Sequence, residues 1–264
     1  MGRRLALVTG ASAGIGAAFA RTLAAKGYDL ALTARRLDRL DRLAEELRTR
    51  FGAEAITIAA DLADRDAPQA VLGELGGRPV DALVNNAGYG LPGAYAQTAW
   101  EDQQAFLQVM LHAPSELAHR VLPGMVERGF GRIVNVASLA GMIPGSAGHT
   151  LYAAVKSYLI KFSQSLHLET KGTGVHVNAL CPGFTYSEFH DVNGTREQIS
   201  RSAPPWLWMT SEAVAEAGFA AVQKGKAVTV PGAPNKTIAA LVKLIPNDAA
   251  LALMASQGPR FRKL

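Results

Sequence analysis

The feature that most constrains the fold is an alternation of short apolar runs with helical segments along the chain. In one helical segment, residues 37–50, leucines recur at a spacing of three or four. Further helices are expected over residues 64–75 and 100–128, the second bent or broken at Pro114 and Pro123. The apolar runs lack the alternating polarity of a half-exposed strand, which is typical of a parallel sheet covered by helices on both faces. The sequence therefore predicts a doubly wound α/β fold with a seven-stranded parallel sheet, whose strands lie near residues 5–8, 28–33, 55–60, 80–84, 132–137, 175–180 and 227–230.

Length and composition indicate one globular domain over residues 1–264. Of these residues, 48% are hydrophobic and 19% are charged, and no linker, repeat or low-complexity segment divides them. The single cysteine, Cys181, cannot form an intrachain disulfide, so we expect a cytoplasmic protein. No apolar run is long enough for a signal peptide or for the roughly 20 residues of a membrane span, so we expect no stable membrane insertion.

The formal net charge of +5 raises the question of an anionic partner such as nucleic acid. The arginines between residues 35 and 50 are interleaved with Asp38, Asp41, Glu45 and Glu46, which is typical of a solvated helix face. No nucleic-acid-binding motif accompanies the charge. We expect neither a nucleic-acid partner nor a bound metal.

A glycine-rich turn, TGASAGIG, follows the first apolar run and opens the first helix. Glycines permit a tight turn and let the backbone approach a phosphate closely. The helix N-terminus adds unpaired N–H donors and a field that favours an anion. At this junction the pattern predicts dinucleotide binding on a Rossmann-type fold. The residues expected at the cofactor are Gly10, Ser12, Gly14, Ile15 and Gly16.

Tyr152 and Lys156 lie four residues apart in a segment predicted to be helical, so their side chains share one face. A neighbouring ammonium favours the phenolate and would lower the pKa of Tyr152 toward the range of a general acid or base. Ser138, at the end of the fifth apolar run, would hold a substrate carbonyl against the phenol. Such a pair alone occurs on many surface helices, but with Ser138 and the dinucleotide turn it indicates a hydride-transfer site.

Together these elements resemble the short-chain dehydrogenase/reductase family. They occur in the family's order over residues 5 to about 190, and the C-terminal ending looks like a subgroup that closes with a helix. The matching elements are the TGASAGIG turn, Asn85-Asn86-Ala87-Gly88, Ser138, Tyr152-x3-Lys156 and Pro182-Gly183.

The resemblance implies an oxidoreductase that interconverts a carbonyl and an alcohol with NAD(P). Tyr152 would protonate the nascent alkoxide as hydride arrives, and Ser138 would position the substrate oxygen. Lys156 would lower the pKa of Tyr152 and hold the nicotinamide ribose. The further cofactor contacts that the resemblance implies are Asp61 at the adenine, Ser187 at the nicotinamide amide, and Asn86, Ala87, Gly88, Pro182 and Gly183.

Two arginines at the end of the second apolar run favour NADP(H). An enzyme for NAD places a carboxylate there, whereas this chain has Ala34 followed by Arg35 and Arg36. A guanidinium suits a 2′-phosphate by its charge and its forked donors, and each such bond contributes roughly 1.5–3 kcal/mol. Ala13 weakens the case slightly, because many NADP-using members of the family carry a basic residue at that position.

One position departs from the family. Met110 stands where a catalytic asparagine normally helps to anchor a water molecule that leads protons from the lysine to solvent. A thioether cannot replace the donor and acceptor of an amide. Three readings compete: a backbone carbonyl at this position holds the water, His112 or His149 replaces the relay, or the protein is slow or catalytically silent.

Residues 184–210 are expected to form a lid over the substrate. Residues 237–258 are expected to form a helical tail that docks on a neighbouring subunit or rests on a membrane surface, and its poorly developed polar face favours docking. A homodimer or homotetramer is expected by analogy with the family. Large apolar side chains in the lid favour a bulky apolar carbonyl compound, although they would equally suit a loop packed by its own residues. The residues expected at the substrate are His149, Phe184, Phe189 and Trp206.

The sequence therefore predicts an NADPH-dependent reductase of a ketone or aldehyde, or the reverse alcohol dehydrogenase. The alternative is an NADP-binding scaffold or regulator that keeps the fold and has lost turnover, as Met110 permits.

Overall fold

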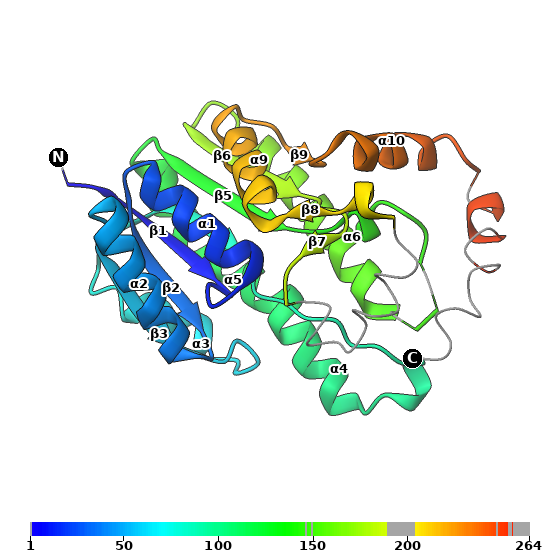
Figure 1. Cartoon of the computed structure of the whole chain (residues 1–264), viewed down its shortest axis with the longest axis horizontal. Coiled ribbons are helices and arrows are strands. Elements are labelled where there is room, and N and C mark those ends of the chain that lie inside the picture. The colour runs from blue at the N-terminus through cyan, green and yellow to red at the C-terminus, as the bar shows by residue number, and fades with distance from the viewer. Residues whose placement is uncertain are drawn as a thin grey trace.

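The computed structural model describes residues 2–145, 147–148, 150–188, 204–246, 248–252 and 255. In this part of the chain the centre is a seven-stranded parallel sheet with the order β3-β2-β1-β4-β5-β6-β9 (Figure 1). The predicted fold is confirmed. The strands are β1 (Arg4–Thr9), β2 (Tyr28–Ala34), β3 (Ala55–Ala59), β4 (Val80–Asn85), β5 (Gly131–Val136), β6 (Val175–Leu180) and β9 (Val228–Thr229).

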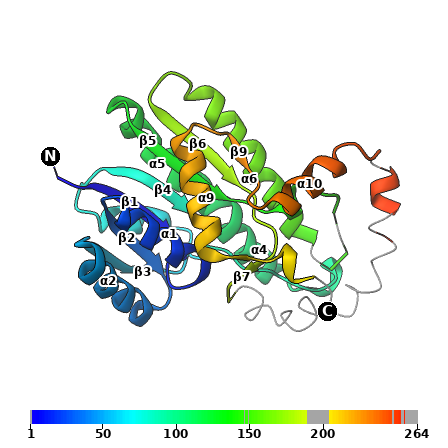
Figure 2. The same ribbon diagram turned by 45° about the horizontal axis from the view of Figure 1, so that its top comes forward.

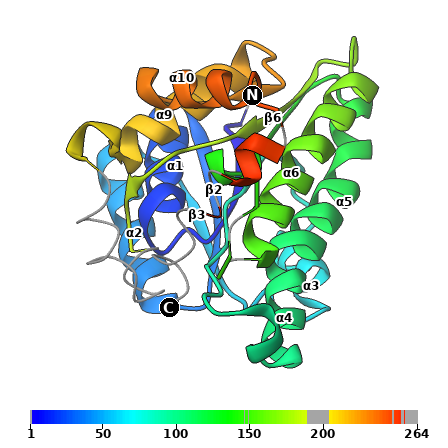
Figure 3. The ribbon, with the colours of Figure 1, turned by 90° about the vertical axis from the view of Figure 1, so that its right-hand side faces the viewer.

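Helices cover both faces of this sheet. Figure 3 shows α1 (Gly14–Ala25), α2 (Leu37–Phe51) and α9 (Ser211–Gln223) on one side of the strands. On the other side lie α3 (Ala67–Gly73), α5 (Ala113–Glu127) and α6 (Thr150–Glu169). Helices α1 and α9, which are far apart in the sequence, lie side by side (Figure 2).

Strand β1 explains why the apolar runs are continuous. Ala6 and Val8 pack into the core beneath α1 and α2, whereas Leu5 and Leu7 pack into the core on the opposite face. All four side chains are almost completely buried. Successive residues of a strand point to opposite faces, so a strand covered on both sides is apolar at every position.

The order of the strands positions the site. From β1 the chain builds outward through β2 and β3, and then returns to place β4 on the other side of β1. Ligands of such sheets bind at the carboxyl ends of the strands where the order reverses. The glycine-rich turn after β1 and the Asn85–Gly88 segment at the end of β4 both lie at this point.

Two helical segments differ from the predicted ranges. The helix expected over residues 64–75 begins only at Ala67. Before it, Asp61 and Asp64 each accept a backbone N–H bond of 3.0 Å from the residue two positions on and hold turns.

The long segment 100–128 is divided into α4 (Trp100–Leu107), a π-helical turn (Gln108–His112) and α5. The interruption precedes Pro114, which has no N–H to donate, whereas Pro123 lies inside α5 without ending it.

The C-terminal helix also begins earlier than expected. Helix α10 covers Ala233–Val242, with Gly232 before it at φ 82° and Pro234 in its first turn. In Figure 1 it lies beyond β6 and β9, away from β1–β3. In the described part of the chain, none of the helices combines the length and apolar character needed to span a bilayer.

Candidate active site

The glycine-rich turn after β1 forms a tight cradle. A Cβ on Gly16 would lie 2.3 Å from the carbonyl oxygen of Gly10, and a Cβ on Gly10 would lie 2.8 Å from Cα of Ala87. Gly10 and Gly14 have φ values of 65° and 54°, which disfavour any residue with a side chain. The glycines are therefore required by close backbone packing.

The N-terminus of α1 suits an anionic ligand. Within the described residues, its N-cap Ala13 makes no side-chain capping bond, and the first turn carries no acidic residue. The first backbone N–H groups of an α-helix have no intrahelical partner, and here no side chain of the N-cap or acidic residue of the first turn competes with an anion for them. The cradle and the helix end together fit the diphosphate of a dinucleotide.

Asn86, expected at the cofactor, lies beside the glycine-rich turn and is bonded to it. Its Nδ2 donates to the carbonyl oxygens of Thr9 (2.9 Å) and Gly10 (3.2 Å). The backbone N–H groups of Asn86 and Ala87 each donate to Oγ1 of Thr9 at 3.0 Å. These bonds fasten the glycine-rich turn to the end of β4, so Asn86 shapes the cofactor cradle through its own backbone partners.

Ser138 and Tyr152 are brought together by close packing of α6 on the loop after β5. Ser138 caps the 3₁₀ turn Leu139–Gly141, where its Oγ accepts a bond of 3.1 Å from the N–H of Ala140. A Cβ on Gly141 would lie 2.5 Å from the backbone of Lys156, so only glycine allows α6 to approach so closely. The phenol of Tyr152 hydrogen-bonds the Ser138 side chain.

The electrostatics of Tyr152 differ from the expectation. Burial raises the pKa of the phenol to about 12, and the hydrogen bond with Ser138 offsets this only in part. The expected lowering by Lys156 is not the dominant effect in the protein alone. At neutral pH the phenol therefore keeps its proton and is a competent acid.

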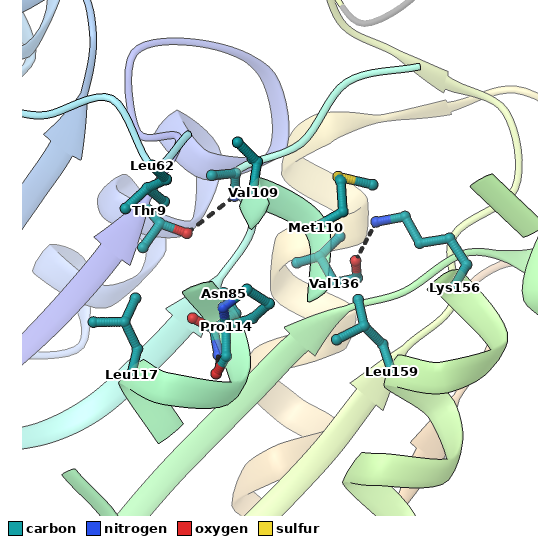
Figure 4. Close-up of a pocket in the computed structure, with 11 residues that line it drawn as sticks. Thr9, Leu62, Asn85, Val109, Met110, Pro114, Leu117, Val136, Lys156 and Leu159 are labelled. Carbon is teal, nitrogen blue, oxygen red and sulfur yellow. Dashed lines mark hydrogen bonds between the residues drawn. The ribbon is translucent and has the colours of Figure 1, made fainter. Parts of the chain in front are cut away.

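Lys156 lies one turn along α6, with Nζ 5.6 Å from the centre of the Tyr152 ring. Its ammonium donates to the carbonyl oxygen of Val136 at 2.8 Å (Figure 4). Burial lowers the pKa of Lys156 to about 8, so the side chain remains mostly charged at neutral pH.

Met110 lies in the π-helical turn and is 2% exposed. Its sulfur packs against Gly88, where a Cβ would lie only 2.6 Å away. Met110 and Lys156 line one small cavity of about 10 Å³, which has room for about one water molecule (Figure 4). His112 is exposed, and His149 lies outside the described residues.

The two arginines after β2 are placed differently. Arg35 is exposed, whereas Arg36 donates to Oγ of Ser12 in the glycine-rich turn at 3.1 Å. Arg36 also donates to Glu188 at 3.0 Å, and Arg39 donates to the other oxygen of Glu188 at 2.5 Å. Arg39 and Glu188 were not among the residues predicted for the cofactor site.

The remaining expected cofactor residues lie around the same edge of the sheet. Asp61 is exposed, with its carboxylate bonded to the N–H of Ala63. The carbonyl of Pro182 accepts a 2.9 Å bond from the N–H of Leu139, and Ser187 packs against Gly14. Gly183 packs so tightly on Asn235 of α10 that a Cβ would lie 2.4 Å from its Oδ1.

The part of the expected lid that the structure describes is aromatic. Strand β7 (Thr185–Tyr186) pairs with β8 (Met209–Thr210), and Trp208 stacks on both Phe184 and Tyr186. Trp206 is 65% exposed, so it does not line a closed pocket here. Phe189 and His149, both expected at the substrate, lie outside the described residues.

A buried polar chain beneath the site was missed by sequence reasoning. Asn85 Nδ2 donates to Pro114 O (3.1 Å) and Asn135 Oδ1 (2.8 Å), and Asn135 Nδ2 donates to Ser163 Oγ (2.9 Å). The chain ties β4 and β5 to α5 and α6. The sequence signal for it was an asparagine near the carboxyl end of each of two mainly apolar strands. Among the described residues, Asn85 Oδ1 has no partner, and Asn85 lines the cavity beside Lys156.

Comparison with known proteins shows the family of this chain. The short chain dehydrogenase family model matches residues 4–198. An uncharacterized oxidoreductase of Myxococcus xanthus (strain DK1622) is 34% identical over 260 residues, which cover 95% of this chain and 97% of the relative. The chain belongs to the short-chain dehydrogenase family. It is an NAD(P)-dependent oxidoreductase that acts on CH–OH or C=O groups.

Two solved structures are informative neighbours. A short-chain dehydrogenase from Sphingobium yanoikuyae in complex with NADPH has a TM-score of 0.78 and 32% identity, covering 92% of this chain and 96% of that one. The bulky-bulky ketone specific alcohol dehydrogenase from Comamonas testosteroni has a TM-score of 0.76 and 29% identity, covering 92% and 93% of the two chains.

Proposed function

We propose that this protein is an NADPH-dependent reductase of a bulky apolar ketone or aldehyde, also able to run the reverse alcohol oxidation. The observation that carries the proposal is a protonated phenol hydrogen-bonded to Ser138, with a pKa raised to about 12 and a buried ammonium one helical turn away. An acid that keeps its proton at neutral pH is suited to carbonyl reduction.

NADPH, when bound, supplies the hydride. The hydroxyl of Ser138 hydrogen-bonds the substrate oxygen and holds it beside Tyr152. Tyr152 donates its phenolic proton to that oxygen as negative charge develops on it. The ammonium of Lys156 stabilises the resulting phenolate and holds the ribose of the cofactor.

The return of the proton to Tyr152 is the step affected by Met110. Pro114 has no N–H, so the carbonyl of Met110 cannot receive the ordinary helical bond from the residue four positions on. This supports the reading in which a backbone carbonyl holds the relay water. The small cavity beside Lys156 and the unpartnered Asn85 Oδ1, among the described residues, further support a water molecule here.

Cofactor preference follows from the arginines at the start of α2. Arg36 hydrogen-bonds Ser12 in the glycine-rich turn. Its guanidinium is therefore suitably placed to bind a phosphate on the adenosine ribose. The NADPH complex of the Sphingobium neighbour supports the same choice.

Replacing Arg35 and Arg36 together by alanine should raise the NADPH dissociation constant at least tenfold, because charge-assisted bonds to the phosphate are lost. Binding of NADH should change little. The double variant Arg42→Ala/Arg48→Ala is the control, since it removes two exposed arginines of the same helix that pair with acidic neighbours. Isothermal titration with both cofactors measures the effect, and equal losses for NADPH and NADH would contradict the assignment.

The substrate class rests on the aromatic lid. Phe184, Tyr186 and Trp208 offer stacked ring surface near the carboxyl end of the sheet. The Comamonas neighbour, described as specific for bulky ketones, supports a similar preference here. The assignments of residues 184–210 as a lid and of a homodimer or homotetramer remain predictions.

A carbonyl panel run with NADPH and with NADH tests the function. If the protein is the proposed reductase, it should oxidise NADPH with aromatic or long-chain ketones and show weaker activity with small polar carbonyls. The alternative, a cofactor-binding scaffold in which Met110 has interrupted the relay, expects tight NADPH binding without turnover on any compound of the panel.

A further inference from the structure

The carboxylate of Glu188 pairs with Arg36, which is expected to bind the cofactor phosphate, and with Arg39 one turn further along α2. Its two oxygens accept bonds from Arg36 (3.0 Å) and Arg39 (2.5 Å), although Glu188 is 152 and 149 residues away from them in the chain. Arg36 simultaneously contacts Ser12 in the glycine-rich turn. The carboxylate therefore occupies the position of an anionic ligand.

The segment that carries Glu188 is fixed across the cradle. The carbonyl of Tyr186 accepts a 2.9 Å bond from Oγ of Ser211, and β7 pairs with β8. Ser187 packs directly against the glycine-rich turn. A Cβ added to Gly14 would lie 2.9 Å from the Cβ of Ser187. These contacts hold the segment beside the glycine-rich turn and place Glu188 within hydrogen-bonding distance of Arg36.

The charges favour competition between this carboxylate and a phosphate. Hydrogen bonds from Arg39 and Arg36 lower the pKa of Glu188, so it remains ionised at neutral pH. A phosphate monoester carries about −1.5 to −2 charges and three acceptor oxygens, more than a carboxylate offers. The ion pairs of Glu188 are about 40% exposed, so they are weak enough for a phosphate to displace.

We propose that Glu188 is a specificity-determining residue that competes with the 2′-phosphate of NADP(H) for Arg36 and Arg39. NADH, which has no 2′-phosphate, leaves the ion pairs intact. Glu188 thereby narrows the preference for NADPH over NADH. The proposal rests on the NADP(H) assignment made above.

The test measures binding of NADPH, NADH and 2′-AMP to the full chain by isothermal titration. Glu188→Gln should tighten NADPH and 2′-AMP about 3- to 10-fold and leave NADH within twofold of wild type. Glu45→Gln is the matched control, because Glu45 also pairs with an arginine of α2 and its loss changes the net charge equally. In an Arg36→Ala background the gain from Glu188→Gln should shrink markedly, since the two residues interact.

The outcomes separate this proposal from the cofactor assignment. Weaker or unchanged NADPH binding by Glu188→Gln would overturn the competition, as would an equal gain for NADPH and NADH. Wild-type protein that binds NADH but neither NADPH nor 2′-AMP would instead overturn the NADP(H) assignment itself.

Discussion

Tyr152→Phe should lose carbonyl reduction by about 10²- to 10⁴-fold while keeping its fold and its affinity for NADPH. The variant removes one hydroxyl, which is the proton donor in the proposed reaction, and general acids contribute an effect of this size. The ring and its place beside Lys156 remain. Steady-state rates, NADPH titration and thermal unfolding of the same preparations measure the three expectations.

Tyr158→Phe on the same helix is the control. Its hydroxyl hydrogen-bonds Ser115 at 2.9 Å and has no role in the proposed reaction, so its loss should leave kcat within a few-fold of wild type. Wild-type turnover in Tyr152→Phe would show that another group donates the proton. Equal losses in both variants would point to a disturbed α6.

Lys156→Met should abolish most activity and yet stabilise the cofactor-free protein. Burial lowers the pKa of Lys156 from an ordinary 10.5 to about 8, a difference equivalent to about 3 kcal/mol. Removing the charge recovers that cost, whereas losing the bond to Val136 O costs about 1 kcal/mol. The free energy of unfolding at pH 7 should therefore rise by about 2 kcal/mol, while the rate falls about 100-fold or more.

The stability gain should depend on pH in a defined direction. The folded protein binds the lysine proton less tightly than the unfolded chain, so the cost of the buried charge is present in full below about pH 8. It declines as the pH rises toward 10.5. Denaturant unfolding at pH 7 and pH 10 should show a larger gain at pH 7. The control Lys161→Met, at an exposed position of α6, should show little gain at either pH, and a destabilised Lys156→Met at pH 7 would contradict the account.

The sheet could be predicted because each buried strand is recognisable from the apolar residues of its own short segment. Leu5–Val8 is apolar at every position and the other central strands are mainly apolar, which fits burial on both faces. The glycine-rich turn was readable for a similar reason, since Gly10 and Gly14 adopt positive φ and Gly16 meets a backbone oxygen. In both cases the backbone geometry or the burial at a position restricts the residue type found there, so the sequence indicates it directly.

Other features depend on contacts between segments that are distant in the sequence, and no local pattern of residues predicts them. The pair of Arg36 with Glu188 and the Asn85–Asn135 bond form only once the sheet is assembled. The spacing of Tyr152 and Lys156 indicated that they share a helix face but carried no information on burial. Burial reverses the expected direction of the Tyr152 pKa shift in the cofactor-free protein.

The central claim is that this site transfers hydride to a carbonyl carbon while Tyr152 supplies the proton. The most direct measurement is a single turnover of the wild-type protein with a bulky aromatic ketone and NADPH carrying deuterium at the transferable C4 position. The account predicts an alcohol with one deuterium on its carbinol carbon, and none from Tyr152→Phe on the same timescale. Tightly bound NADPH with no labelled alcohol from any ketone would contradict it.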